Sequence, residues 1–317
     1  MLHTETEDGF PVNIPYSFCG YKFLNILGFG STSIVGLVEE ENTCQLFSAK
    51  IMPKRYIEEK NLTEKIQKEM AVMGEVDHPN IVKIYRTFEL KNRIDESYII
   101  SIMEYCENGD LLSYATEHGF NNEFERSKIL KGFLEAVKYL HRRGISHGDI
   151  KPENILIDSN FNAKLTDFGY CRTTLIAGDE SKSGTLYYAA PELFTSGEFD
   201  TRKTDIWSIG ITLYCLSEGR FPYKNGKPKF VIGQISSGKL CFSLTITEKL
   251  KKLVQKCTNL IPENRPSVEE IMDDEYFFTY DKIYDCINQD AIEPYSTEYS
   301  ENSYKSGYGS SDYSLDF

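Results

Sequence analysis

The first hundred residues consist mainly of short runs in which apolar and polar side chains alternate. β-branched and aromatic residues are frequent in these runs, and glycine or polar turns separate them, which predicts a meander of antiparallel strands. Residues 57–75 differ, because apolar side chains recur there at helical spacing with Glu and Lys between them. The pattern therefore predicts one amphipathic helix, ended by the proline turn at 78–80. The strands are expected at 21–30, 31–40, 45–52, 81–90 and 98–106.

Helical periodicity dominates the chain after these strands. Residues 205–219 form its most apolar stretch, which favours a helix at the centre of a core, whereas residues 247–260 are amphipathic. The chain thus divides into a strand-rich part that ends near residue 104 and a helix-rich part that ends near 280. Residues 1–20 show only a weak pattern and are expected to be an N-terminal extension.

The last part of the chain, residues 281–317, has a different composition. From residue 295 onward it contains seven Ser and five Tyr and few aliphatic side chains, and the segment is net acidic. Such a segment cannot bury enough apolar surface to offset the entropy lost on ordering. We expect a disordered tail, which either carries regulatory or docking partners or only solvates the chain.

Composition narrows the class of protein. Forty per cent hydrophobic residues in a chain of 317 allow a sizeable core, and a net charge of −13 disfavours unspecific binding of nucleic acid. The eight cysteines form no CxxC pair and no zinc-ligand spacing, so we expect them to be reduced. No signal-peptide pattern and no apolar run near the roughly 20 residues of a membrane span occur. A cytoplasmic or nuclear location is expected.

A glycine-rich turn, GFGSTSIV at 28–35, joins two of the predicted strands. Gly28 and Gly30 have no Cβ, so the backbone N–H groups can approach a phosphate closely. A dinucleotide-binding turn would lead into a helix, whereas this one leads into another strand. Taken alone, the motif fits a simple glycine hairpin better than a phosphate-binding loop.

A second segment, HGDIKPEN at 147–154, concentrates polar side chains. It contains Asp149, Lys151 and Asn154, and Asp167 follows eighteen residues after Asp149. A carboxylate can accept the proton of a hydroxyl, and an Asn oxygen with a second carboxylate makes a hard ligand set that suits Mg²⁺. The Lys can neutralise charge that passes between nucleophile and leaving group. These groups are the ones that phosphoryl transfer requires.

Taken in order, the motifs resemble those of the eukaryotic protein kinases over residues 21 to about 280. The further landmarks are FSAK ending at Lys50, the helical Glu69, DFG beginning at Asp167, APE ending at Glu192, DIWSIG beginning at Asp205 and ENRP around Arg265. The resemblance implies an α+β fold of two lobes. An antiparallel N-lobe sheet with one main helix would occupy 21–103, a hinge 104–110, and a mostly helical C-lobe 111–280.

The resemblance also implies roles for single residues in the use of ATP and Mg²⁺. Asp149 would accept the proton of the substrate hydroxyl, Lys151 would contact the γ-phosphate, and Lys50, paired with Glu69, would bind the α- and β-phosphates. The two Mg²⁺ ions would be held by Asn154 and Asp167. The other nucleotide contacts would come from Gly28, Phe29, Gly30, Ser31, Val35, Glu104, Cys106 and Asp110, with Met103 as gatekeeper. A buried structural ion pair would join Glu192 and Arg265.

Two features favour serine and threonine over tyrosine as substrates. Lys151 follows Asp149 by two positions, and Thr185 stands where serine/threonine kinases place a Thr near these two residues. The motif sequences SHGDIKPENILID and LTDFGYCR, in the predicted helical lobe, are similar to those of the calmodulin-dependent and AMP-activated kinase group. The resemblance therefore implies transfer of the ATP γ-phosphate to Ser or Thr hydroxyls of protein substrates.

Three positions depart from the family pattern. Ser33 and Ser48 are small residues in place of Gly and Ala, so we expect modest effects. Gly148 stands where most of the family has an Arg that pairs with a phosphate on the activation segment. We therefore expect a kinase of the non-RD type, whose activity does not depend on phosphorylation of the activation segment. The candidate sites in that segment are Thr173, Thr174, Ser181 and Ser183.

Two other function classes remain open. A pseudokinase scaffold would bind nucleotide or partners without transfer, but the full set of Lys50, Glu69, Asp149, Asn154 and Asp167 favours an enzyme. A small-molecule or lipid kinase is disfavoured by the APE segment and Arg265, which accompany protein substrates in the family.

Overall fold

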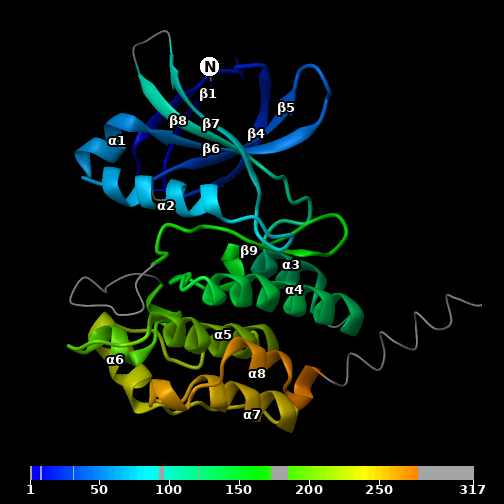
Figure 1. Cartoon of the computed structure of the whole chain (residues 1–317), viewed down its shortest axis with the longest axis vertical. Coiled ribbons are helices and arrows are strands. Elements are labelled where there is room, and N and C mark those ends of the chain that lie inside the picture. The colour runs from blue at the N-terminus through cyan, green and yellow to red at the C-terminus, as the bar shows by residue number, and fades with distance from the viewer. Residues whose placement is uncertain are drawn as a thin grey trace, which may run out of the picture.

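A strand-rich upper lobe and a helical lower lobe make up the molecule (Figure 1). The structure is a computed structural model, and it describes residues 2–7, 9–30, 32–92, 96–120, 122–172 and 185–277. The predicted tail, Ser31 and the four candidate phosphorylation sites lie outside the described residues.

The upper lobe is built on an antiparallel sheet with the strand order β3-β4-β5-β6-β8-β7. In β6, alternation sends Ala49 and Ile51 into a hydrophobic core, whereas Ser48 and Lys50 line a cavity on the other face. Register pairs Lys50 with Val35 on one side, so the strand after the glycine turn lies beside the strand that carries the lysine. The strands are β3 Ser17–Phe18, β4 Tyr21–Phe29, β5 Ile34–Glu40, β6 Leu46–Pro53, β7 Ile84–Lys91 and β8 Ser97–Met103.

The expectation of a single helix over 57–75 is wrong in one respect. Two helices occupy this region, α1 at Lys54–Glu59 and α2 at Thr63–Glu75. Between them Asn61 adopts a left-handed backbone with φ of 54°, a conformation that Asn tolerates better than most residues. The apolar spacing runs through this break and so does not reveal it. Helix α2 lies below the sheet, on the side that faces the lower lobe (Figure 1).

The N-terminal segment folds as part of the upper lobe. Strands β1 (Leu2–Glu5) and β2 (Pro11–Ile14) pair as an antiparallel hairpin. Val12 and Ile14 are buried and belong to the same hydrophobic core as Ile51 of the sheet. The weak pattern of residues 1–20 conceals this packing because each strand contributes only two buried side chains or fewer.

The lower lobe packs around α5 (Thr201–Glu218), which is buried along most of its length, as the apolar stretch at 205–219 predicts. The Asp200 side chain caps its first turn, and Gly219 ends it with a left-handed backbone. A short hairpin, β9 (Ile155–Ile157) with β10 (Ala163–Leu165), faces the upper lobe. The other helices are α3 Leu111–His118, α4 Glu123–Arg142, α6 Pro228–Ser237, α7 Glu248–Cys257 and α8 Val268–Met272.

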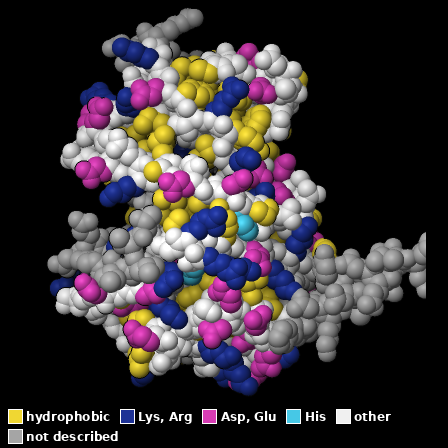
Figure 2. All heavy atoms as spheres, in the orientation of Figure 1, with side chains coloured by type: hydrophobic (Ala, Val, Ile, Leu, Met, Phe, Trp, Pro, Cys, Tyr) yellow, Lys and Arg dark blue, Asp and Glu magenta, His cyan; other side chains and the backbone are white. Residues whose placement is uncertain are grey.

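Charged side chains of both signs are interspersed over the face shown in Figure 2, without a continuous basic stripe there. Within the described ranges, no helix combines the length and the hydropathy needed to cross a bilayer. The compartment of the protein stays a prediction from the sequence.

Candidate active site

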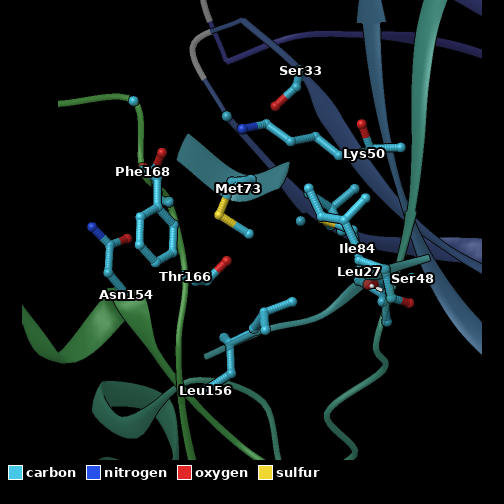
Figure 3. A pocket seen from close by; sticks show the side chains of 18 of the residues that line it. Leu27, Ser33, Ser48, Lys50, Met73, Ile84, Asn154, Leu156, Thr166 and Phe168 are labelled. Carbon is cyan, nitrogen blue, oxygen red and sulfur yellow. Dashed lines mark hydrogen bonds between the residues drawn. The ribbon is translucent and has the colours of Figure 1, made fainter. Parts of the chain in front are cut away.

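A cavity of about 510 Å³ lies between the two lobes. The outline of the molecule is indented between the lobes, as the space-filling view shows (Figure 2). Ser48 and Lys50 lie on the sheet side of the cavity, and Asn154 and Leu156 lie on the opposite side (Figure 3). The cavity therefore joins the glycine-rich turn to the HGDIKPEN segment, which are more than a hundred residues apart in the chain.

The glycine-rich turn forms the roof of the cavity. The Gly30 N–H donates to the Ser33 carbonyl at 2.8 Å and closes the turn. A Cβ on Gly30 would lie 3.1 Å from the Ser33 hydroxyl, so a larger residue there would require that side chain to move. A Cβ on Gly28 would meet nothing within 4 Å, which leaves space for a ligand near its backbone. Val35 also lines the cavity, and the Phe29 ring is 53% exposed at the rim.

Lys50 and Glu69 form an ion pair at the back of the cavity, with 2.6 Å between Nζ and Oε1. Their side chains are 17% and 13% exposed. Burial alone would lower the pKa of Lys50, but the carboxylates of Glu69 and Asp167 outweigh burial and raise it above its ordinary value. Lys50 is therefore a fixed positive charge, held by α2 against the sheet.

Asp149 is the centre of a hydrogen-bonded cluster on the floor of the cavity. Its Oδ1 accepts the Thr185 N–H at 2.9 Å, and its Oδ2 lies 2.9 Å from Lys151 Nζ and 3.0 Å from Asn154 Nδ2. Lys151 also donates to the Thr185 hydroxyl at 2.8 Å. The prediction that Thr185 lies near Asp149 and Lys151 is confirmed. Burial works against the charge of Lys151, but Asp149 outweighs it and raises the pKa of this lysine.

The Asp205 carboxylate fixes the backbone of the HGDIKPEN segment. In the sequence, Asp205 is identified only as the first residue of the DIWSIG motif, with no role predicted for it. Asp205, 1% exposed at the start of α5, accepts the N–H groups of His147 at 2.8 Å and Gly148 at 2.9 Å. His141 of α4 contacts the same carboxylate through Nε2 at 2.8 Å. Gly148 has φ of 81°, and a Cβ there would lie 2.5 Å from the Tyr170 carbonyl oxygen. A side chain at position 148 would thus require the backbone to move.

Asp167 has a left-handed backbone with φ of 62°, an uncommon conformation for a non-glycine residue. Phe168, beside it, is buried and packs edge-on against the His147 ring at 5.1 Å. Met73 of α2 packs against the hydrophobic cluster that contains Phe168, and both side chains line the cavity (Figure 3). This packing holds Asp167 toward the cavity. Burial would raise the pKa of Asp167, but the charge of Lys50, together with that of Lys151, lowers it.

The donor set at Asn154 and Asp167 fits a hard divalent cation. Asn154 Nδ2 donates to the Asp149 carbonyl at 2.8 Å and to its carboxylate, so the amide oxygen of Asn154 is left for another partner. The lowered pKa keeps Asp167 ionised. An amide oxygen and a carboxylate, completed by phosphate oxygens and water, suit Mg²⁺.

The hinge segment presents its backbone along one edge of the cavity. The Ser48 hydroxyl donates to the Glu104 carbonyl at 2.9 Å, a bond that the usual Ala at this position would not make. Cys106 is buried, and burial raises the pKa of its thiol to about 12. Asp110 lines the cavity, but its carboxylate also caps α3 by accepting the Ser113 N–H at 2.9 Å. The sequence does not reveal this second use of Asp110.

Glu192 and Arg265 form the predicted buried ion pair. Two parallel bonds of 2.6 and 2.8 Å join the guanidinium to the two carboxylate oxygens. Arg265 is 2% exposed, and it also donates to the carbonyls of Lys203 and Asn259. Its guanidinium lies 5.1 Å from the ring centre of Trp207. The pair anchors the segment before α5 to the segment before α8, away from the cavity.

Comparison with known proteins places these observations in a family. The family model for the protein kinase domain matches residues 21–277. The chain belongs to the protein kinase family. Its two-lobed α+β fold is thereby confirmed, with the antiparallel sheet and the helical lobe in their predicted order.

This kinase resembles several curated protein kinases, one of which is named as a serine/threonine kinase. It is 33% identical over 275 residues to the serine/threonine-protein kinase cds1 of Schizosaccharomyces pombe. The aligned region covers 82% of this chain and 58% of that protein. It is 31% identical over 266 residues to sucrose non-fermenting protein kinase 1 of Fusarium virguliforme, which covers 83% of this chain and 37% of that protein. The similarity to a third relative, 3-phosphoinositide-dependent protein kinase B of Dictyostelium discoideum, is 34% over 264 residues, 81% of this chain and 28% of that protein. The kinase thus matches less than two thirds of the length of each of these relatives.

Proposed function

We propose that the protein transfers the γ-phosphate of ATP to Ser or Thr hydroxyls of protein substrates, with Mg²⁺ as cofactor. One observation carries the proposal. One hydrogen-bonded cluster on the floor of the cavity contains Asp149, Lys151, Asn154 and Thr185. The Lys50–Glu69 ion pair lies at the back of the same cavity. The kinase domain and the relative named as a serine/threonine kinase support the proposal.

The proposed mechanism assigns one task to each group. Asp149, with its carboxylate oriented by Thr185 and Asn154, accepts the proton of the substrate hydroxyl as that oxygen bonds to the γ-phosphorus. The bond from the γ-phosphorus to the bridging oxygen breaks in the same step, and ADP leaves. Lys151 neutralises charge at the transferred group. Lys50 binds the α- and β-phosphates, and the glycine turn covers them. Asn154 and Asp167 are the residues that would hold Mg²⁺, which would supply positive charge to offset that of the phosphates.

The adenine would lie along the hinge, with backbone bonds to Glu104 and Cys106, between Val35 and Leu156. The Ser48 hydroxyl already occupies one lone pair of the Glu104 carbonyl, and a carbonyl oxygen has a second one available. Asp110 is proposed to contact the ribose hydroxyls through the carboxylate that also caps α3.

The decisive experiment is a transfer assay. We expect the purified protein with Mg·ATP to phosphorylate members of a positional-scanning Ser/Thr peptide library, and chelation of Mg²⁺ to remove the activity. Tyr peptides serve as the matched substrate control. The residue preferences around the acceptor report the substrate groove, where Glu107, Asp110 and Glu153 would favour basic residues before the acceptor. Nucleotide binding without transfer to any peptide would instead support a pseudokinase scaffold.

We further propose that the kinase is of the non-RD type. Gly148 supplies no cation for a phosphate on the activation segment. The HGDIKPEN backbone is instead held by the Asp205 carboxylate, through the N–H groups of His147 and Gly148. These bonds exist without any phosphorylated residue, which supports a catalytic loop that is organised from the outset.

Replacement of Thr173, Thr174, Ser181 and Ser183 together by Ala is therefore expected to leave the rate within about threefold of the parent protein. The reason is that a charge-assisted bond to a phosphate, typically about 1.5–3 kcal/mol, is missing in both proteins. The rate is measured with a fixed peptide at saturating ATP, and phosphatase treatment of the parent protein is the control. A hundredfold loss would contradict the non-RD proposal.

A further inference from the structure

The N-terminal hairpin lies outside the segment that the kinase family accounts for. The family match begins at residue 21, whereas the hairpin spans residues 2–14. It is nonetheless well anchored. Val12 and Ile14 are 0% and 1% exposed and share a core with Ile51 and Ile100 of the sheet. The hairpin therefore has a fixed position relative to the strands that carry the glycine turn and Lys50.

The hairpin turn reaches the glycine-rich turn. The Glu7 N–H donates to the Gly30 carbonyl at 3.3 Å, at the long end for such a bond. The same oxygen accepts the Ser33 N–H at 3.4 Å, inside the glycine turn. The hydrogen bond from Glu7 thus comes from outside the glycine turn and connects Gly30 to the hairpin. Glycine-rich turns have few side-chain contacts of their own, so one external bond is a large share of their restraint.

The turn that carries Glu7 is itself rigidly closed. Thr6 donates its N–H to the Phe10 carbonyl at 2.8 Å, and its buried hydroxyl accepts the Phe10 N–H at 3.1 Å. Gly9 completes the turn with φ of 77° and an N–H bond to the Thr6 carbonyl. The position of the Glu7 N–H is therefore set by the hairpin and not by its own side chain.

Two further contacts fix the hairpin to neighbouring elements. The Phe10 ring packs against Tyr56 of α1, with 4.8 Å between ring centres. The Asn13 N–H donates to the Tyr98 hydroxyl at 3.2 Å, and Asn13 Nδ2 donates to Glu96 at 3.0 Å. Helix α1 leads into α2, which carries Glu69. One hairpin thus touches the glycine turn, the start of the helical segment and strand β8.

We propose that the hairpin of residues 2–14 is a positioning element for the nucleotide-binding turn. It holds the Gly30 carbonyl through the Glu7 N–H and so sets the height of the turn over the cavity, which raises the affinity for nucleotide. The role rests on the proposed function, because the nucleotide is the ligand whose affinity changes. It adds to that function a contribution from outside the kinase domain.

The test uses a pair of substitutions at one position. Glu7→Pro removes the N–H donor, whereas Glu7→Ala removes only the side chain and serves as the matched control. We expect Glu7→Pro to raise the Kd for Mg·ADP, measured by calorimetry on the full chain, about three- to tenfold, because the free turn is then less well ordered and must be ordered when the nucleotide binds. The restraint lost is at most that of one net hydrogen bond. The kcat at saturating ATP should change less than twofold, and Glu7→Ala should match the parent protein.

A second pair tests the anchor. Phe10→Ala loosens the contact with Tyr56 and is expected to weaken Mg·ADP binding in the same direction. Tyr16→Ala is its control, because the Tyr16 ring is 63% exposed. Thermal unfolding of all four variants shows that they are folded at the temperature of the binding experiment.

Hydrogen exchange separates this inference from the proposed function. Without nucleotide, peptides that cover residues 27–37 should exchange faster in Glu7→Pro than in Glu7→Ala. If the parent protein neither binds nor transfers nucleotide, the proposed function fails and the effect on affinity fails with it, whereas faster exchange would still show that the hairpin restrains the glycine turn. The positioning role of the hairpin would be overturned if Glu7→Pro and Glu7→Ala had the same exchange rates and the same affinity for nucleotide.

Discussion

Asp149→Asn is expected to lower the rate of phosphoryl transfer by about 10³-fold, within the range of roughly 10²–10⁴ that a positioned general base contributes. The substitution keeps the size of the side chain but removes the group that accepts the hydroxyl proton. It also places an amide NH₂ among three donors, because Thr185, Lys151 and Asn154 all direct hydrogens at this carboxylate. The measurement is single-turnover transfer from Mg·ATP to the best library peptide.

The effect should be on the chemistry rather than on nucleotide binding. The Kd for Mg·ADP is expected to stay within about threefold of the parent value. Lys50, Glu69 and Asp167 are unchanged, so the nucleotide keeps its hydrogen-bonding partners. Asp273→Asn, at an exposed position after α8, is the charge-matched control. A rate within tenfold of the parent rate would show that Asp149 is not the base.

Arg265→Met should have the largest effect on stability. Removal of the guanidinium leaves the Glu192 carboxylate, 10% exposed, without its bidentate partner, and breaking a buried pair in this way costs about 3–5 kcal/mol. The carbonyls of Lys203 and Asn259 also lose a donor. For a domain of this size, about 2–4 °C per kcal/mol implies a Tm lower by roughly 6–20 °C.

An exposed ion pair gives the matched control. Lys251 and Glu248 lie 3.5 Å apart on α7 with side chains 36% and 66% exposed, so Lys251→Met should change the free energy of unfolding by less than about 1 kcal/mol. The double variant Arg265→Met with Glu192→Gln removes the uncompensated charge and should recover part of the loss. Equal Tm values for Arg265→Met and Lys251→Met would contradict a structural role for the buried pair.

The sequence predicts the local features of the fold well because they depend on local patterns. Alternation finds the strands of the upper lobe, and the apolar run at 205–219 finds the buried helix α5. Spacing along the chain also identifies Asp149, Lys151 and Asn154 as neighbours, since a short loop keeps them together. The meeting of Lys50 with Glu69, nineteen residues away, follows only from the family resemblance.

The sequence does not predict unusual backbone conformations or contacts between distant segments. The break at Asn61 depends on a backbone conformation that apolar spacing does not encode. The burial of Val12 depends on a core supplied by strands far along the chain. The bonds from Asp205 to the catalytic loop connect residues 57 and 58 positions apart. Periodicity reports which face of an element is buried, but not which partner covers it.

The geometry at Gly148 disfavours an Arg side chain at this position. An Arg there would place a side chain on a left-handed backbone, at about 1–2 kcal/mol, and within 2.5 Å of the Tyr170 carbonyl oxygen. The segment after DFG would have to shift to accommodate it. With this loop geometry, glycine at position 148 and the bonds from the loop N–H groups to Asp205 are compatible, whereas a larger side chain would disturb both the loop and the segment after DFG.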